Sequence, residues 1–286
     1  MAKSLRQIRQ DLAAFEEKTT ELGESLNRLY RQYLESLTIS IKQQLILASY
    51  QICTQIYPEE FLKLSFNQRE KLQGNLRQMV QELEAKLLAY LEPSPQIPQA
   101  TITEQILFQL SQTEESSLPT VNSQQPSNLS QIKNPEELVN WCKSIEQGIN
   151  NTLDKLSKEA NKCLQRAKII QANLPNQLLE MALQAEQSGM SPGGTPNILN
   201  LLVETNPNSE EEEEEEEEKA RNITKISVIR LRLSEIMFSD PSLSLKRKEI
   251  RNLLETLKKM RHNYHQTKQE YAKAEAETAW RASWHE

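Results

Sequence analysis

Apolar residues recur near the start of the chain at alternating spacings of three and four positions. They are Leu5, Ile8, Leu12, Phe15, Thr19, Leu22, Leu26, Leu29 and Tyr33, with Thr19 the polar member. This spacing places one stripe on a helix and is typical of a coiled-coil heptad repeat. The stripe continues to Ile56, where Tyr57-Pro58 ends it. We predict one helix over residues 1–57 and name the stripe from Leu5 to Tyr33 the N-terminal seam.

A second helix is predicted to begin after Ser65, because Ser65 and Gln68 have the spacing of a capping box. Its apolar positions share one helical face: Leu72, Leu76, Met79, Leu83, Leu87 and Tyr90. The short connection favours folding back, antiparallel, on the distal half of the first helix. Residues 1–92 are therefore predicted to form an N-terminal helical hairpin.

Prolines after this hairpin indicate a linker over residues 93–133, rich in Pro, Ser and Gln, with a short stub helix at 102–110. Asn134-Pro135-Glu136 then has the features of a helix start: a capping Asn, Pro at the first helical position and a carboxylate near the positive end of the helix dipole. We predict a central helical segment over residues 134–189. It comprises a helix to about Ala172 and a shorter one from Pro175 to Ser188.

Residues 190–219 combine Pro, Gly and Asn with an unbroken run of glutamates from Glu210 to Glu218. We predict that this stretch is a disordered linker, since it offers little apolar surface to offset the entropy of ordering. The following stretch, Ile223 to Phe238, is ambiguous. Its Ile229-Arg230-Leu231-Arg232-Leu233 alternates like a strand, but its apolar residues also share a helical face, and the surrounding helices favour helix.

A second stripe with alternating spacings of three and four closes the chain and is named the C-terminal seam. Its members are Ile250, Leu253, Leu257, Met260, Tyr264, Thr267, Tyr271, Ala274 and Thr278. Residues 220–286 are thus predicted to form a basic helical hairpin that turns at Ser239-Asp240-Pro241. The two seams have nearly the same length, so we expect them to pair with each other within the chain or between the chains of a homodimer.

These elements predict an all-α fold of long antiparallel helical hairpins with coiled-coil packing. Aromatic residues make up only 5% of the 286 residues, which leaves little material for a large compact core and favours an elongated shape. The 6 glycines, an unusually small number, also disfavour a fold rich in turns and strands.

Charge is distributed unevenly along the chain. The formal net charge is −6, and the glutamate run alone contributes nine negative charges, so the remainder is slightly basic. The densest basic set, which we name the C-terminal basic set, comprises Arg230, Arg232, Lys246, Arg247, Lys248, Arg251, Lys258, Lys259 and Arg261, together with Lys225. Such a set binds the phosphates of nucleic acid or of an anionic membrane, or it forms an ordinary solvated helix face.

Sequence motifs for catalysis or cofactor binding are absent. Asp occurs at three positions only, and no nucleotide-binding, nucleophile-elbow or zinc-ligand spacing is found. His262 and His265 share a helical face, but two ligands do not make a metal site, and we interpret them as a solvated pair. We therefore predict no enzymatic activity, no cofactor and no metal site.

The three cysteines, Cys53, Cys142 and Cys163, are too widely spaced and too few to indicate a disulfide framework. They fall on apolar helical faces, where thiols behave as small buried hydrophobic groups. The chain also lacks any apolar stretch of 18 residues. A reducing cytoplasm is the predicted location.

Two segments carry a resemblance to a known group of proteins. Residues 45–54, LILASYQICT, and residues 270–284, EYAKAEAETAWRASW, resemble the ends of uncharacterised cyanobacterial coiled-coil proteins of similar length. That resemblance implies a bacterial cytoplasmic setting. It implies no activity and no role for any residue.

The predicted function is that of a non-enzymatic coiled-coil scaffold or adaptor that mediates protein–protein assembly. Trp280, Arg281 and Trp284 form the candidate partner-binding anchor, because exposed aromatic residues with an Arg are typical of binding hot spots. Protein partners are expected, and a homodimer is the alternative to pairing of the two seams within one chain. The alternative is a basic-helix module that binds nucleic acid or an anionic membrane surface and is screened by the glutamate run.

Overall fold

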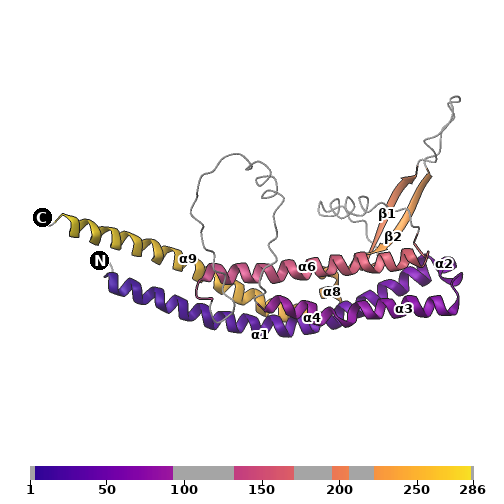
Figure 1. The fold of residues 1–286 in the computed structure, drawn as a ribbon, viewed down its shortest axis with the longest axis horizontal. Helices are drawn as coiled ribbons and strands as arrows, with labels where there is room; N and C mark the ends of the chain where they lie inside the picture. Colours follow the sequence, from indigo (N-terminus) through magenta and orange to yellow (C-terminus); the bar gives the residue numbers. More distant parts are fainter. Residues whose placement is uncertain (1–3, 93–131, 171–194, 206–221, 285–286) are drawn as a thin grey trace, which may run out of the picture. The chain divides into compact units, whose positions relative to one another are not determined.

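The computed structural model describes residues 4–92, 132–170, 195–205 and 222–284 (Figure 1). Most of the described residues are helical, and the described strands form one small two-stranded sheet. The three longest helices are α1 (Leu5–Gln51), α6 (Pro135–Arg166) and α9 (Pro241–Ser283). The shorter elements are α2 (Pro58–Leu62), α3 (Phe66–Gln81), α4 (Leu83–Leu88), α8 (Leu233–Ser239), β1 (Ile198–Thr205) and β2 (Asn222–Ile229).

The chain divides into two compact units, which are described separately. Unit 1 comprises Met1–Arg28, Ala89–Cys142 and Asn252–Glu286, and unit 2 comprises Leu29–Leu88 and Lys143–Arg251. Each unit therefore contains a part of α1, a part of α6 and a part of α9.

The predicted end of the first helix is confirmed at Tyr57-Pro58. The last turn, Ile52–Ile56, widens into a π-helix, and the Tyr57 amide donates to the Ile52 carbonyl over 2.9 Å. Pro58 then occupies the first turn of α2, where its missing amide hydrogen is not needed.

The predicted capping box is also present. The Ser65 amide donates to Gln68 Oε1 over 2.8 Å, and the Gln68 amide donates to Ser65 Oγ over 3.4 Å, so α3 begins at Phe66. Helix α3 and the short α4 bury the predicted apolar face through Leu72, Leu76, Leu83 and Leu87.

Helix α6 starts as predicted and ends earlier than predicted. The Glu136 amide donates to Asn134 Oδ1 over 2.9 Å at its start. The predicted end near Ala172 is wrong, because Lys168 adopts a left-handed conformation with φ of 59°. The amides of Lys168 and Ile169 donate to the carbonyls of Gln165 and Leu164, which is the Schellman pattern that closes a helix at Arg166.

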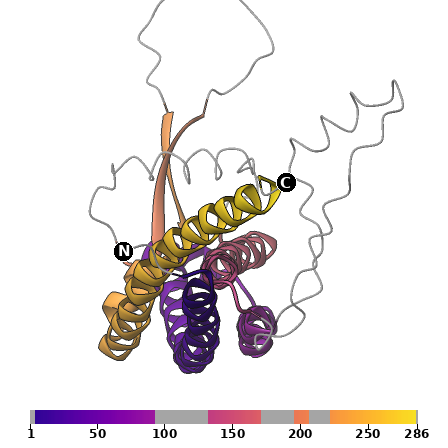
Figure 2. The same ribbon diagram turned by 90° about the vertical axis from the view of Figure 1, so that its left-hand side faces the viewer.

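In unit 1, side chains of the two predicted seams contact each other. The rings of Phe15 and Tyr264 meet edge to face with centroids 6.2 Å apart, and Thr19 Oγ1 lies 4.0 Å from Met260 Sδ. Arg9 Nε donates to the Tyr271 hydroxyl over 3.1 Å. Figures 1 and 2 show that the last turns of α9 (yellow) run clear of α1.

In unit 2, four polar side chains join the three long helices. Arg247 on α9 donates through both terminal nitrogens to the carboxylate of Glu146 on α6, over 2.5 and 2.6 Å. The Tyr30 hydroxyl on α1 donates to Glu146 Oε1 over 2.9 Å. The Arg247 guanidinium also lies over the Tyr33 ring, 5.6 Å from its centroid. We name these four residues the tyrosine–ion-pair cluster.

The predicted disorder of residues 190–219 is wrong for residues 198–205, and the predicted helix at 223–238 is wrong for its first half. Strands β1 and β2 pair antiparallel, with Ile198 opposite Ile229 and Thr205 opposite Asn222. Burial of Ile198, Leu199, Val228 and Ile229 at the base offsets the entropy of ordering. The second half of the ambiguous stretch is helical, as α8. In Figures 1 and 2 the hairpin projects from the helices of unit 2.

Several predicted segments lie outside the described residues. These are most of the linker over 93–133 with its stub helix, the short helix from Pro175 to Ser188, and the glutamate run.

The two tyrosines of the cluster give a matched pair of Tyr→Phe substitutions with different expected results. Tyr30→Phe removes a hydrogen bond to a carboxylate and should lower the free energy of unfolding by about 1–2 kcal/mol. Tyr33→Phe should leave it unchanged or slightly raised, since the buried Tyr33 hydroxyl has no hydrogen-bond partner among the described residues. Urea unfolding of the full chain measures both, and equal losses would contradict the assignment.

The pH dependence of the same variants provides a second test. Burial raises the pKa of Tyr33 to about 12, with Arg247 lowering it and Glu146 raising it by smaller amounts. In the unfolded chain a tyrosine ionises at pH ~10. Because Tyr33 keeps its proton to a higher pH in the folded state, the free energy of unfolding should fall as the pH rises from about 10 to about 12. Tyr33→Phe should reduce this fall in the free energy of unfolding, as measured by urea unfolding between these pH values.

Candidate functional site

The base of the β hairpin is fixed by side chains that bind its backbone. Asn161 on α6 donates to the Ile229 carbonyl and accepts from the Ile229 amide, both over 2.8 Å. Ser157, one turn earlier, accepts from the Leu231 amide over 2.9 Å. The Tyr57 hydroxyl accepts from the Ser227 amide over 2.8 Å. At its base, the outer edge of β2 therefore has its backbone groups bound by side chains rather than by a third strand.

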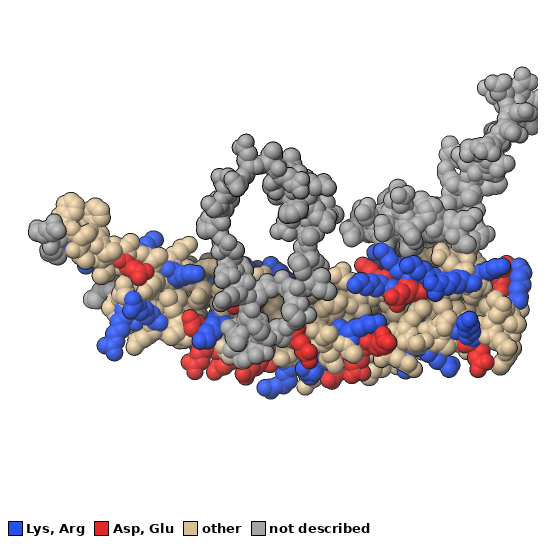
Figure 3. All heavy atoms as spheres, in the orientation of Figure 1, with Lys and Arg blue, Asp and Glu red and all other residues tan. Residues whose placement is uncertain are grey.

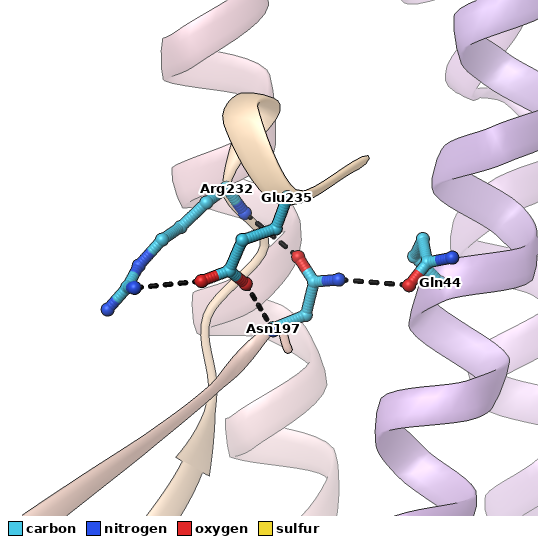
Figure 4. A network of polar contacts seen from close by, with 4 residues as sticks. All are labelled: Gln44, Asn197, Arg232 and Glu235. Atoms are coloured by element: carbon cyan, nitrogen blue, oxygen red, sulfur yellow. Dashed lines mark hydrogen bonds and ion pairs between the residues drawn. The ribbon is translucent and has the colours of Figure 1, made fainter. Parts of the chain in front are cut away.

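Asn197 connects this hairpin to α1 and α8 (Figure 4). It is buried and adopts a left-handed conformation with φ of 60°, which Asn tolerates better than most residues. Its side chain donates to Gln44 Oε1 over 3.0 Å and accepts from the Arg232 amide over 3.1 Å. Its own amide donates to Glu235, and Glu235 also pairs with the Arg232 guanidinium over 2.8 Å. This network holds the start of β1 in place and offers no reactive group.

Four members of the C-terminal basic set are engaged within the chain. Arg232, Arg247 and Arg261 pair with Glu235, Glu146 and Glu136, respectively. Lys246 donates to the Gln32 carbonyl over 3.2 Å and to the Ser36 hydroxyl. Arg230 is half-buried beside the hairpin, and Lys248, Arg251, Lys258 and Lys259 are exposed, whereas the side chain of Lys225 is not among those described. The sequence-predicted patch is therefore reduced by internal contacts.

Another basic surface, on α6, was missed by the sequence analysis. Lys155, Lys158, Lys162 and Arg166 follow one another at spacings of three and four and thus share one helical face. We name them the α6 basic stripe, and Figure 3 shows Lys and Arg gathered over this part of the helix. Lys155, Lys162 and Arg166 are exposed, and none of these three has an ion pair within the described part of the chain. Their spacing, opposite the apolar face of α6, is a signal that the sequence already contained.

The α6 basic stripe adjoins the hairpin base. Lys158 and Arg230 share the lining of one shallow pocket with Asp154 and Asn161. Its enclosed volume, about 20 Å³, has room for about one water molecule, so the pocket is not a ligand site.

Trp280 and Trp284 lie on the last turns of α9 in unit 1. Their rings stack with centroids 5.2 Å apart, and 64% and 73% of their surfaces are exposed. Arg281 pairs with Glu277 over 3.8 Å. Every residue from Glu275 to Trp284 is exposed, so this end of α9 is covered by no other described part of the chain. We name Trp280 and Trp284 the tryptophan pair.

The seam residues differ in burial. Ile8, Leu26, Ile250, Leu257 and Met260 are buried. Leu5, Leu12, Phe15, Leu22, Leu29, Leu253 and Tyr264 are half-buried. The residues of the C-terminal seam are less buried toward the end of α9, and the tryptophan pair lies beyond the last seam residue.

Within the described ranges, no cluster of three His, Cys, Asp or Glu side chains is arranged to hold a metal ion. His265 Nε2 lies 3.2 Å from Glu136 Oε2, and His262 contacts Gln266. All three cysteines are buried and none forms a disulfide, and burial raises the pKa of the Cys53 thiol to about 11. None of the helices in the described part of the chain combines the length and the apolar character needed to span a membrane.

Comparisons with known proteins place no constraint on function, since no family model, curated protein or solved structure matches the chain.

The basic residues Arg247 and Lys248 are neighbours in sequence but should differ in how much they contribute to the stability of the fold. Arg247→Ala leaves the half-buried Glu146 carboxylate unpaired and should lower the free energy of unfolding by about 2–3 kcal/mol. Lys248→Ala removes the same charge from an exposed position and should change it by less than about 0.5 kcal/mol. Urea unfolding of the two full-length variants measures the difference, and similar losses would argue against a structural role for Arg247.

Asn161→Ala should loosen the hairpin while leaving the helices intact. It removes two hydrogen bonds to Ile229, so we expect the Ile229 amide to exchange its hydrogen about tenfold faster or more, which corresponds to roughly 1.4 kcal/mol. Hydrogen exchange followed by mass spectrometry measures this change. Asn151→Ala, at an exposed position of the same helix, is the matched control. Unchanged exchange at residues 226–229 in Asn161→Ala would disprove the role of Asn161.

Proposed function

We propose that the protein is a non-enzymatic scaffold or adaptor of the cytoplasm and that the tryptophan pair on α9 docks a protein partner. The observation that carries this proposal is the exposure of two stacked indole rings at the uncovered end of a helix. Trp is the residue type most enriched among binding hot spots, and large apolar side chains in contact with water favour burial in a partner. Arg281 supplies a polar flank to the same surface.

The proposed architecture is an antiparallel coiled-coil pairing of the two seams. Going along α1 from Arg9 to Phe15 and Thr19, the contacted residues on α9 descend from Tyr271 to Tyr264 and Met260. Contacts that descend in this way support antiparallel helices. Pairing within the chain leaves the tryptophan pair, rather than the seams, as the surface available to a partner.

The alternative function, binding of nucleic acid or an anionic membrane through the C-terminal basic set, has less support. Arg232, Arg247 and Arg261 are occupied by carboxylates of the same chain. A phosphate would have to displace these partners, at a cost in stability that an exposed basic helix does not incur.

Affinity purification of the full-length protein from its native cells tests the proposal. The double variant Trp280→Ala/Trp284→Ala should reduce recovery of the specific partners about 30-fold, which corresponds to a loss of roughly 2 kcal/mol at a hot spot. The helix should persist, because the two rings are largely exposed and stack on each other.

Phe238→Ala is the matched control, since Phe238 is 90% exposed on α8 and tests whether any exposed aromatic ring gives the same effect. Partners that persist in the Trp double variant, or that are lost equally from Phe238→Ala, would refute docking at the tryptophan pair.

A further inference from the structure

Three members of the α6 basic stripe, Lys155, Lys162 and Arg166, are exposed and have no ion pair within the described part of the chain. The four cations of the stripe extend over 12 residues of helix, whose 11 steps of 1.5 Å cover about 16 Å. Exposed Glu159 is the one carboxylate that lies between its members in sequence. A surface of this kind fits an extended anionic segment rather than a compact anion.

The same chain contains an anionic segment of suitable length. The glutamates from Glu210 to Glu218 follow one another without interruption in the connection between β1 and β2. Nine extended residues span about 30 Å, which exceeds the length of the stripe. We propose that the α6 basic stripe binds the glutamate run of a second copy of this chain. This proposal concerns a different surface from the tryptophan pair and does not rest on the proposed function.

The length of the hairpin favours a second copy, rather than the same chain, as the source of the glutamates that bind the stripe. Asn161 and Lys158 place the stripe at the base of the hairpin, whereas the glutamate run is attached at its far end, after Thr205 and before Asn222. Eight strand residues rise about 26 Å. Glu214, in the middle of the run, is nine residues from Thr205 and reaches back about 30 Å at full extension. Within one chain only the middle of the run reaches the base, whereas a second chain can offer all nine glutamates.

The residues around the stripe favour an acidic protein segment over a nucleic acid. No aromatic side chain accompanies the four basic residues on their face of α6, so base stacking is not provided for.

Sedimentation velocity of the full-length protein at low and high salt tests the proposal. The wild-type chain should self-associate reversibly at low salt, and the association constant should fall about tenfold or more when the salt concentration is raised well above physiological. The stripe variant Lys155→Gln/Lys162→Gln/Arg166→Gln should be monomeric, as should a loop variant with every Glu from Glu210 to Glu218 changed to Ser. Circular dichroism checks that both keep their helical content.

A mixing experiment separates binding between chains from binding within one chain. The stripe variant retains its glutamates, and the loop variant retains its basic stripe, so an equimolar mixture should form a heterodimer although each variant alone does not. Lys248→Gln/Lys258→Gln/Lys259→Gln, an equal charge change at exposed positions of α9, should self-associate like the wild type. Trp280→Ala/Trp284→Ala should do the same, which keeps this test independent of the proposed function.

Four results would overturn the proposal. A wild-type chain that is monomeric at low salt lacks the interaction, and a mixture of variants that stays monomeric excludes contact between chains. Self-association that survives in the stripe variant places the contact elsewhere. Stripe-dependent binding of duplex DNA or of phosphatidylserine vesicles, at a salt concentration where no self-association occurs, would assign the stripe to a phosphate-bearing partner instead.

Discussion

The ion pair between Glu146 and Arg247 is the interaction on which the packing of unit 2 depends most. Each side chain is only about a quarter exposed or less, so both charges have lost much of their hydration. Such a loss is offset only by close, correctly oriented contacts, and the pair has two hydrogen bonds of its own and a third from Tyr30. A slide of α9 by one turn would leave both charges unpaired. The pair therefore selects one register of α9 against α6 and α1.

That register determines the role of the residues around it. Leu243 and Ile250, one turn before and one turn after Arg247, are fully buried. Lys246 is directed to the backbone of α1, and Lys248 is left in solvent. The position of α6 matters equally, because Ser157 and Asn161 lie further along the same helix and hold the backbone of the hairpin. A two-stranded sheet is marginal by itself, so the hairpin persists because α6 is fixed.

The sequence predicted the helices and their ends where the signals were local. The capping box at Ser65 and Gln68 and the Asn134 cap each involve residues within three positions of one another, and all were confirmed. The hairpin was missed because the apolar pattern from Ile226 to Leu233 fits a helix as well as a strand. The contact that decides between them joins Asn161 to Ile229, 68 positions away. No periodicity within one segment contains that information.

The candidate sites were predictable to different degrees, for a related reason. A sequence gives the number of basic residues in a segment, but only the fold decides which of them meet a carboxylate, as the neighbours Arg247 and Lys248 illustrate. The tryptophan pair was identified because two aromatic residues accompany an Arg, and in the structure the pair is exposed because it lies beyond the region where the seam residues are buried. The α6 basic stripe is sparser in the sequence than the C-terminal basic set, so the local density of basic residues does not reveal it, although its helical spacing is regular. Regular spacing on the face opposite the buried residues is the better criterion, since it selects cations that the packing of their own helix leaves in solvent.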